Sequence, residues 1–293
     1  GSDLEGLKAA AAQALDEARR AGATAAEVSS SRDHGLSVNV RLGEVETLEY
    51  HKDQGIALTV YLGHSKGSAS TADLRPESLR ETALAACRIA RFTAPDDCAG
   101  LADAELLASD PPDLDLCHPW TLSADEAIEL ARECERAARE RDARIVNSEG
   151  ASLGSYRAAM VYANTHGFME GYETTRHSLS CSVLAGDAQG AMQRDHWYSV
   201  ARRAADLESV TAVGEMAADR ALRRLGGRRL GPRRCPVVFV PDVARSLIGN
   251  FIAAISGGAL YRRASFLLDR LGEPVFPDFV RIHEQPHLLR ALG

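Results

Sequence analysis

The sequence predicts an α+β protein in which helices flank a mainly antiparallel sheet. Three observations indicate this class. Amphipathic helical stretches occur beside segments in which apolar and polar residues alternate, and glycine-containing turns separate these segments. The strict strand–helix alternation that is typical of a parallel sheet is absent. Because 293 residues are enough to form two cores, we also expect two domains.

The first part of the chain is predicted to be a helix followed by paired strands. Residues 4–21 place apolar side chains at helical spacing. Two alternating stretches, 36–42 and 56–62, then predict strands, and residues 63–67 are typical of a hairpin turn. A second helix is predicted to begin near Pro76, because proline suits the first position of a helix.

The middle of the chain repeats this kind of pattern after a long surface connection at residues 99–119, which is rich in aspartate and proline. The run from Ser123 to Glu126 is a capping box that predicts the start of a helix. Another helix is predicted at about 206–225. Between these helices we expect antiparallel strands in three stretches, 145–146, 160–162 and 179–183.

A change of composition at residues 223–234 predicts the boundary between the two domains, which we place at 1–230 and 231–293. Six arginines occur there among glycines and a proline. Beyond the boundary, residues 237–240 predict a short buried strand, and Pro241 predicts the start of a helix that ends at Ser256-Gly257-Gly258.

Charge and cysteine spacing exclude several classes of protein. The chain has 34 basic and 41 acidic residues and a net charge of −7, which argues against a general nucleic-acid binder. The six cysteines form no CxxC pair, so we expect buried, reduced thiols. No apolar stretch is long enough to span a membrane, and no signal-peptide pattern occurs at the N-terminus, which favours a cytoplasmic protein.

One motif with catalytic chemistry occurs near the C-terminus. Residues 283–287 read HEQPH and match HExxH, in which two histidines one helical turn apart bind zinc and the glutamate activates water. Pro286 lies inside the motif, where it opposes a continuous helix. We therefore favour a histidine-rich turn over a zinc site formed by His283, Glu284 and His287. Dinucleotide, P-loop and nucleophile-elbow motifs are absent, and no catalytic residue is assigned.

Several segments also occur together in a characteristic order. They are VRLGEVE at 40–46, GIALTVY at 55–61, KGSASTADL at 66–74, NTHGF at 164–168, PVVF at 236–239, SGGALY at 256–261 and LGEPV at 271–275. As a set they resemble the PmbA/TldD family, and more closely its PmbA (TldE) branch, over most of residues 4–293. Family members continue for about another domain, so we expect the C-terminal domain to be incomplete here, either naturally or through missing sequence.

The resemblance implies a subunit of a cytoplasmic two-component zinc metalloprotease that acts on unstructured peptides. In this family a TldD-like partner carries the zinc on an HExxxH helix, whereas the corresponding helix here, 247–255, has no histidine and no glutamate. The resemblance therefore implies no metal ligand and no cofactor in this chain, zinc in a TldD-like partner, and a heterodimer or homodimer. Four residues are expected to line the substrate groove near the partner's site: Asn250, Ser256, Gly257 and Gly258.

The leading hypothesis is thus a non-metal-binding subunit that shapes a peptide channel and is not catalytic alone. Two alternatives remain open. One is a stand-alone zinc hydrolase that uses the HExxH motif. The other is a regulatory protein that contacts DNA or a topoisomerase through the arginines of 223–234, because closely spaced guanidinium groups bind phosphates and carboxylates.

Overall fold

The computed structural model describes residues 2–292 and divides them into two compact units. The first unit contains the residues up to Gly227 together with the segment that begins at Pro286. The second unit is Arg228–Gln285. The segment after Gln285 therefore returns to the first unit, although it follows the second in sequence.

The first unit consists of two consecutive halves with the same order of elements, αβββα. The first half contains α1 (Ser2–Arg20), β1 (Ala25–Arg41), β2 (Glu44–Leu62), β3 (Ser65–Thr71) and α2 (Pro76–Phe92). The second half contains α3 (Ala124–Glu140), β4 (Ile145–Asn164), β5 (Met169–Gly186), β6 (Met192–Ala201) and α4 (Val210–Arg223). Short 3-10 helices at Ala104–Leu106 and Ala204–Asp206 interrupt the connections.

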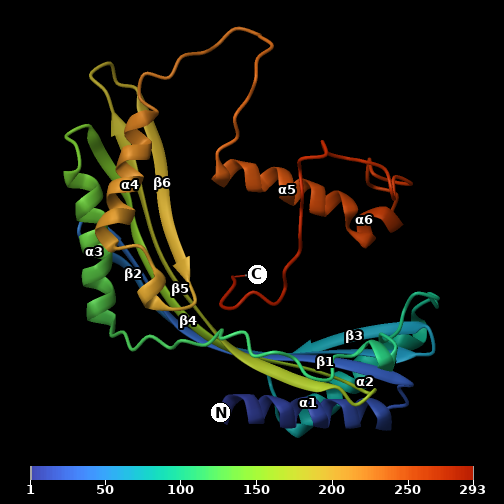
Figure 1. Cartoon of the computed structure of the whole chain (residues 1–293). Helices are drawn as coiled ribbons and strands as arrows, with labels where there is room; N and C mark the ends of the chain where they lie inside the picture. Colours follow the sequence, from blue (N-terminus) through green and yellow to red (C-terminus); the bar gives the residue numbers. More distant parts are fainter. Residues whose placement is uncertain (1, 293) are drawn as a thin grey trace. The chain divides into compact units, whose positions relative to one another are not determined.

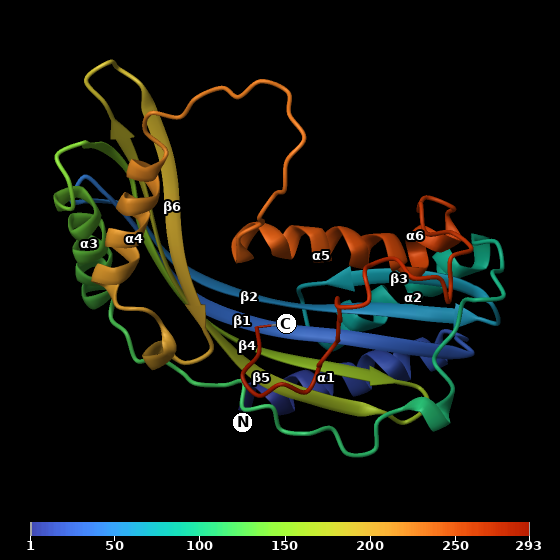
Figure 2. The ribbon, with the colours of Figure 1, turned by 45° about the horizontal axis from the view of Figure 1, so that its top comes forward.

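All six strands form one antiparallel sheet in the order β3-β2-β1-β4-β5-β6, so β1 and β4 join the two halves. The sheet is strongly curled, and all four helices lie on its outer face, with α1 and α2 at one end and α3 and α4 at the other (Figures 1 and 2). The predicted fold class, α+β with a mainly antiparallel sheet, is confirmed. The predicted capping box is also present, because Ser123 and Glu126 exchange hydrogen bonds at the start of α3.

Two apolar cores lie between the sheet and these helix pairs. Alternate residues of β1 point into them, with Ala26 and Val28 under α1 and α2, and with Val38 and Val40 under α3 and α4. Because side chains alternate between the two faces of a strand, both helix pairs cover the same face of the sheet. The inner, concave face is left without helices from this unit.

A polar band separates the two cores on the helix-covered face. Arg32 donates to Asp3 (2.7 Å), Arg157 donates to Glu173 (2.7 Å), and Ser155 is hydrogen-bonded to His177 (3.0 Å). This band explains why the strands are longer than predicted. The apolar alternation stops at the band, but β4 and β5 continue through it as strands of 20 and 18 residues.

A buried carboxylate fixes the turn between β1 and β2. Glu135 of α3 is 1% exposed and accepts hydrogen bonds from the backbone amides of Leu42 (2.7 Å) and Gly43 (2.8 Å). Both turn residues have positive φ angles, 53° and 82°. Such angles are typical of a tight hairpin turn, and they point both amides toward the carboxylate. This contact links the first half of the sheet to a helix of the second half.

The second unit contains two helices, α5 (Pro241–Ile255) and the short α6 (Gly257–Tyr261). The predicted buried strand at 237–240 is wrong. These residues form no strand, and Val238 is 91% exposed. An isolated apolar run cannot form sheet without a neighbouring strand to accept its backbone hydrogen bonds, and the second unit has none among the described residues. None of the helices within residues 2–292 is long and apolar enough to cross a lipid bilayer.

The cysteines are free thiols, as expected, but only three of the six are buried. Cys87, Cys134 and Cys181 lie in the apolar cores. The expectation is wrong for Cys98 and Cys235, which are exposed because they lie in connections outside the helices and strands.

Replacing Glu135 with alanine tests the carboxylate that holds the β1–β2 turn. We expect Glu135→Ala to lower the free energy of unfolding by about 1–3 kcal/mol, because two amides lose a charged acceptor. Urea denaturation followed by circular dichroism measures this. The control is Glu133→Ala, an exposed position of the same helix, which should change stability by less than about 0.5 kcal/mol. Equal stability of both variants would contradict the assigned role.

A second substitution tests how closely α3 and α4 approach each other. A Cβ atom at Gly214 would overlap the carbonyl oxygen of Cys134 and lie 3.0 Å from the amide nitrogen of Ala138. We expect Gly214→Ala to destabilise the protein by about 1–3 kcal/mol, although alanine favours helices. Gly6→Ala in α1 is the matched control. It meets nothing within 4 Å, so it should stabilise the protein by roughly 0.5–1 kcal/mol.

Candidate functional site

An open groove of about 1630 Å³ runs over the concave face of the sheet and is lined only by residues of the first unit. Its floor carries hydroxyl and aromatic side chains from β1, β4 and β5, among them Ser29, Ser31, Tyr162 and Tyr172. These residues occupy the strand positions that alternate with the apolar core residues. One face of each strand therefore builds the core, and the other face builds the groove.

The groove is lined by more carboxylates than basic side chains, but three of these carboxylates are ion-paired: Glu170 with Lys8, Glu173 with Arg157, and Asp115 with Arg290. Its lining includes one arginine, Arg202, and five carboxylates: Asp53, Asp113, Asp115, Glu170 and Glu173. Such a surface repels phosphate groups and attracts cations or basic side chains. Asp53 and Asp113, which form no ion pair among the described residues, thus favour neutral or cationic groups over phosphates at this surface.

A pair of tyrosines is fixed at one end of the groove. The carboxylate of Glu27 accepts hydrogen bonds from the hydroxyls of Tyr61 (2.7 Å) and Tyr162 (2.8 Å). Burial, followed by the hydrogen bond to Glu27, raises the pKa of Tyr61. Burial also raises the pKa of Tyr162. Both phenols thus remain protonated donors, and Tyr162 presents a rigid aromatic ring to the groove.

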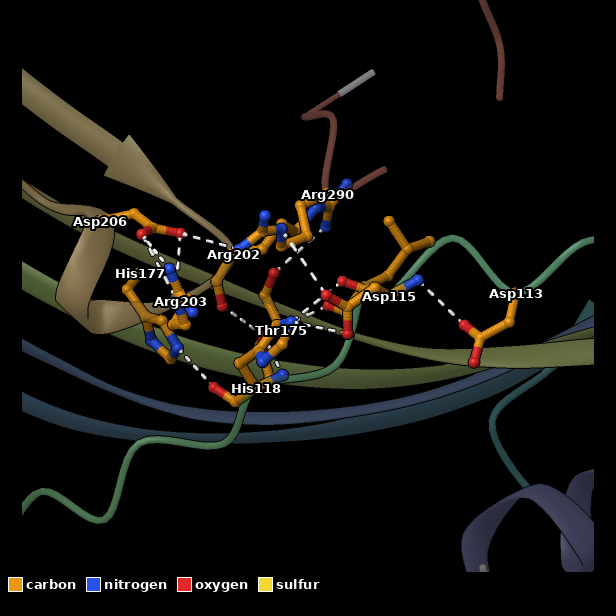
Figure 3. A network of polar contacts seen from close by, with 10 residues as sticks. Asp113, Asp115, His118, Thr175, His177, Arg202, Arg203, Asp206 and Arg290 are labelled. Atoms are coloured by element: carbon orange, nitrogen blue, oxygen red, sulfur yellow. Dashed lines mark hydrogen bonds and ion pairs between the residues drawn. The ribbon is translucent and has the colours of Figure 1, made fainter. Parts of the chain in front are cut away.

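The segment from Pro286 to Ala291 lies in this groove and is held by its backbone. The amide of Arg290 donates to the carbonyl of Leu114 (2.8 Å), and Arg202 Nε donates to the carbonyl of Ala291 (3.0 Å). Figure 3 shows Arg290 and Arg202 side by side above the strand that carries Thr175. The segment therefore forms part of the groove's wall, and two of its main-chain groups attach it to the rest of the unit.

Charged contacts supplement these backbone bonds. The Arg290 guanidinium lies 3.6 Å from a carboxylate oxygen of Asp115 and 3.8 Å from one of Asp206. Hydrogen bonds from Arg203 lower the pKa of Asp206, with a further contribution from the charge of Arg290. The carboxylate therefore stays ionised, and Arg290 faces negative charge on two sides (Figure 3).

Arg202, at the end of β6, connects this segment to the sheet. Its guanidinium donates to the hydroxyl of Thr174 and to the carbonyl of Thr175, while its own carbonyl accepts from the Thr175 hydroxyl (2.6 Å). The amide of Thr175 donates to the carbonyl of Leu116 (2.9 Å). This part of β5 lies beyond its pairing with β6. The connection at Leu116 and the side chain of Arg202 therefore cover a free edge of the sheet.

A buried histidine lies next to this edge and serves as a structural group. His177 is 1% exposed, and its Nε2 donates to the carbonyl of His118 (2.9 Å), so its Nδ1 accepts from the Ser155 hydroxyl. Trp120 packs edge-on against the ring at 5.4 Å. Both nitrogens are thus engaged, and the ring anchors the long connection onto the sheet (Figure 3).

The four residues predicted to line a substrate groove lie in the second unit. Asn250 is in α5 and donates to the carbonyl of Ser246 (2.9 Å), and Ser256 caps α6, which contains Gly257 and Gly258. None of the four is among the lining residues of the groove in the first unit. Their place in a substrate groove stays a prediction.

The HExxH motif does not have the local structure that zinc binding requires. Residues 281–285 form neither helix nor strand, and 286–287 form a turn. The two histidines are therefore not placed one helical turn apart on a common face. Pro286 explains why no helix forms here, because proline lacks the backbone N–H that a continuous helix requires.

The arginines around the predicted boundary are divided between the two units, with Arg223 and Arg224 in the first and the other four in the second. Arg224, at the end of α4, lies 3.5 Å from a carboxylate oxygen of Asp195, which Arg220 also contacts at 3.3 Å. Arg228 and Arg229 lie in an exposed irregular segment. Part of the positive charge is therefore neutralised within the first unit.

Three family models of the PmbA/TldD type match successive parts of the chain. They are described as PmbA/TldA metallopeptidase domain 1 (residues 26–90), central domain (117–225) and C-terminal domain (232–293). The first two fall on the two αβββα halves.

Curated relatives agree with this match. The chain is 48% identical over 268 residues to "Metalloprotease PmbA" of Escherichia coli O157:H7, covering 92% of this chain and 59% of that protein. It is 46% identical over 287 residues to "Metalloprotease PmbA homolog" of Haemophilus influenzae, covering 98% and 63%. The chain thus spans about three fifths of the length of the curated relatives it matches.

Solved structures share the fold. A "putative modulator of DNA gyrase" from Bacteroides thetaiotaomicron is 28% identical with a TM-score of 0.90, covering 97% of this chain and 65% of that chain. TldE from Thermococcus kodakarensis is 16% identical with a TM-score of 0.68, covering 90% and 59%. At the lower identity the likeness concerns the fold alone.

Removing the Arg202 side chain tests how the segment in the groove is held. We expect Arg202→Ala to increase hydrogen exchange of the amides at 287–292 about tenfold, because the segment loses the hydrogen bond from a charged donor to the carbonyl of Ala291. Mass spectrometry of peptic peptides measures the exchange. The control is Arg194→Ala in β6, which removes an exposed ion pair with Glu149 of β4. It should leave the exchange rates of these amides unchanged. Unchanged exchange in Arg202→Ala would rule out the assigned anchor.

Proposed function

Because this chain belongs to the PmbA/TldD family of metallopeptidases, as the resemblance in its sequence predicted, we propose that it is a subunit without the catalytic zinc in a cytoplasmic peptidase complex of the TldD/TldE type. A TldD-like partner supplies the zinc, and the substrates are unstructured peptides. The chain covers only part of the length of its relatives, so the activity of the whole protein belongs to this proposal.

The observation that carries the proposal is the chemistry of α5. The resemblance places the family's metal helix here, yet the helix contains no histidine, glutamate or cysteine. Its two neutral polar side chains are used within the helix, since Ser246 donates to the carbonyl of Val243 (2.6 Å) and Asn250 to that of Ser246. Zinc prefers imidazole, thiolate and carboxylate ligands. The one such group in α5 is the carboxylate of Asp242 in its first turn. A single carboxylate does not fit a zinc site, which takes three or four protein ligands.

The groove in the first unit supports a peptide as the substrate class. Its lining combines hydroxyl groups with carboxylates, and backbone groups of Arg290 and Ala291 in its wall are bound by hydrogen bonds, which supports recognition of polypeptide backbone. Recognition through main-chain groups tolerates many sequences, as an enzyme acting on unfolded peptides requires. Tyr162, fixed by Glu27, adds apolar ring surface for side chains of any sequence.

Reconstitution with a zinc-bearing partner tests this proposal. The chain is purified alone and together with a TldD-like protein, and both samples are assayed for cleavage of casein with and without a chelator. We expect no cleavage by the chain alone. We expect co-purification with the partner and cleavage that the chelator abolishes.

A matched variant assigns the activity to one subunit. Replacing the glutamate of the partner's HExxxH helix with glutamine should abolish cleavage, whereas Glu284→Gln in this chain should leave it unchanged. Chelator-sensitive cleavage by this chain alone, lost in Glu284→Gln, would overturn the proposal and support a stand-alone zinc hydrolase.

A further inference from the structure

Three potential metal ligands lie together where β1 and β2 cross the middle of the sheet. Asp33 Oδ1 is 2.8 Å from His51 Nε2, and ligand atoms of Asp33, His51 and Asp53 all lie within 4.8 Å of one another. Within residues 2–292 this is the one group in which three histidine, cysteine or carboxylate side chains approach so closely.

The register of the two strands produces this arrangement. Asp33 and Asp53 are direct partners across the β1–β2 pair. His51 lies two residues before Asp53 in β2, so the two side chains leave the strand on the same face. The basic neighbour Lys52 lies between them and points to the opposite face. The three ligands therefore converge on regular strand positions and not on a mobile loop.

No lysine or arginine among the described residues forms an ion pair with Asp33 or Asp53. Two carboxylates directly opposite each other in an antiparallel pair repel one another. Among the described residues, the ion pair found for the cluster is the one between His51 and Asp33. The nearby Arg32 is bound to Asp3 (2.7 Å) and lies at a register position on the other face. A bound cation would relieve this repulsion.

Neighbouring residues restrict the imidazole of His51. Its direct partner in β1 is Gly35, which has no side chain to compete for the space. The ring of Tyr156 lies over Gly35 and packs edge-on against His51, with ring centroids 6.5 Å apart. An aromatic wall of this kind limits the rotation of a ligating imidazole, as an outer shell does in known metal sites.

The donor set identifies the class of ion. One imidazole nitrogen with two carboxylate oxygens suits zinc and similar divalent transition metals. Four tetrahedral ligands at about 2.0–2.1 Å from zinc are about 3.3 Å apart. The ligand atoms of the three side chains lie within 4.8 Å of one another, so binding requires the more widely spaced of them to move closer together.

We propose that Asp33, His51 and Asp53 bind one divalent transition-metal ion at the edge of the groove. Asp53 also lines the groove, so the coordination position that the protein leaves open is accessible to a carbonyl or carboxylate of a bound peptide. The site belongs to β1 and β2 and is independent of α5. The inference therefore holds whether or not the proposed function is correct, and it assigns no catalytic step to the ion.

Calorimetric titration with Zn²⁺ tests the site directly. The chain of residues 1–293 is stripped with a chelator, dialysed and titrated near neutral pH. We expect the wild-type chain to bind one more equivalent of Zn²⁺ than His51→Ala binds. In Asp53→Asn the affinity for this equivalent should fall at least about tenfold, because a charged ligand becomes a neutral amide.

The matched control is His34→Ala, an exposed histidine next to Asp33 that lies on the opposite face of β1. It should bind Zn²⁺ as the wild type does. Zinc bound at exposed thiols or at the HExxH segment contributes equally to all four proteins, so only the difference between variants counts. Identical titrations of the wild type and His51→Ala would overturn the proposal. Absence of binding to the wild type at 100 µM Zn²⁺ would also overturn it, because a Kd of ~10 µM is readily detected at this concentration. Circular dichroism confirms that the variants remain folded.

Discussion

The structure of the first unit depends on burying one face of a long, curled antiparallel sheet. Two helix pairs cover that face, and alternate strand residues fill the two cores beneath them. Because a strand presents its side chains alternately to the two faces, the same constraint places the intervening residues on the concave face. The polar character of the groove is thus a direct consequence of how the core is built.

The middle of the sheet is where apolar burial stops and polar contacts take over. On the helix-covered face, ion pairs and the His177 network hold the strands between the two cores. At the sheet edge, Arg202 and the segment around Leu116 satisfy the free backbone of β5. Hydrogen bonds made by charged groups are stronger than neutral ones, so they can replace apolar packing over this short stretch.

The two proposals assign different chemistry to different parts of the chain. In the first, α5 offers a single carboxylate, Asp242, and no imidazole or thiolate, and the hydroxyl-lined groove of the first unit is proposed to bind extended polypeptide. In the second, the cluster of Asp33, His51 and Asp53 is proposed to bind a cation at the edge of that groove. A cation there would lower the negative charge of the groove and give a bound peptide a fixed point of contact.

The sequence alone determined the fold class, the position of most helices and the family, because apolar periodicity, capping residues and ordered motifs are local properties. It did not reveal the length of β4 and β5, since the polar band interrupts their alternation, and it mispredicted a strand at 237–240, where no neighbouring strand supplies hydrogen bonds. The groove and the metal cluster had no signal in the sequence. Asp33 lies 18 residues before His51, and Arg202 lies 89 residues before its partner Ala291. The register of the strands brings Asp33 and His51 together, and the return of the segment after Gln285 to the first unit brings Arg202 and Ala291 together. Such contacts between distant segments depend on tertiary packing and not on local spacing.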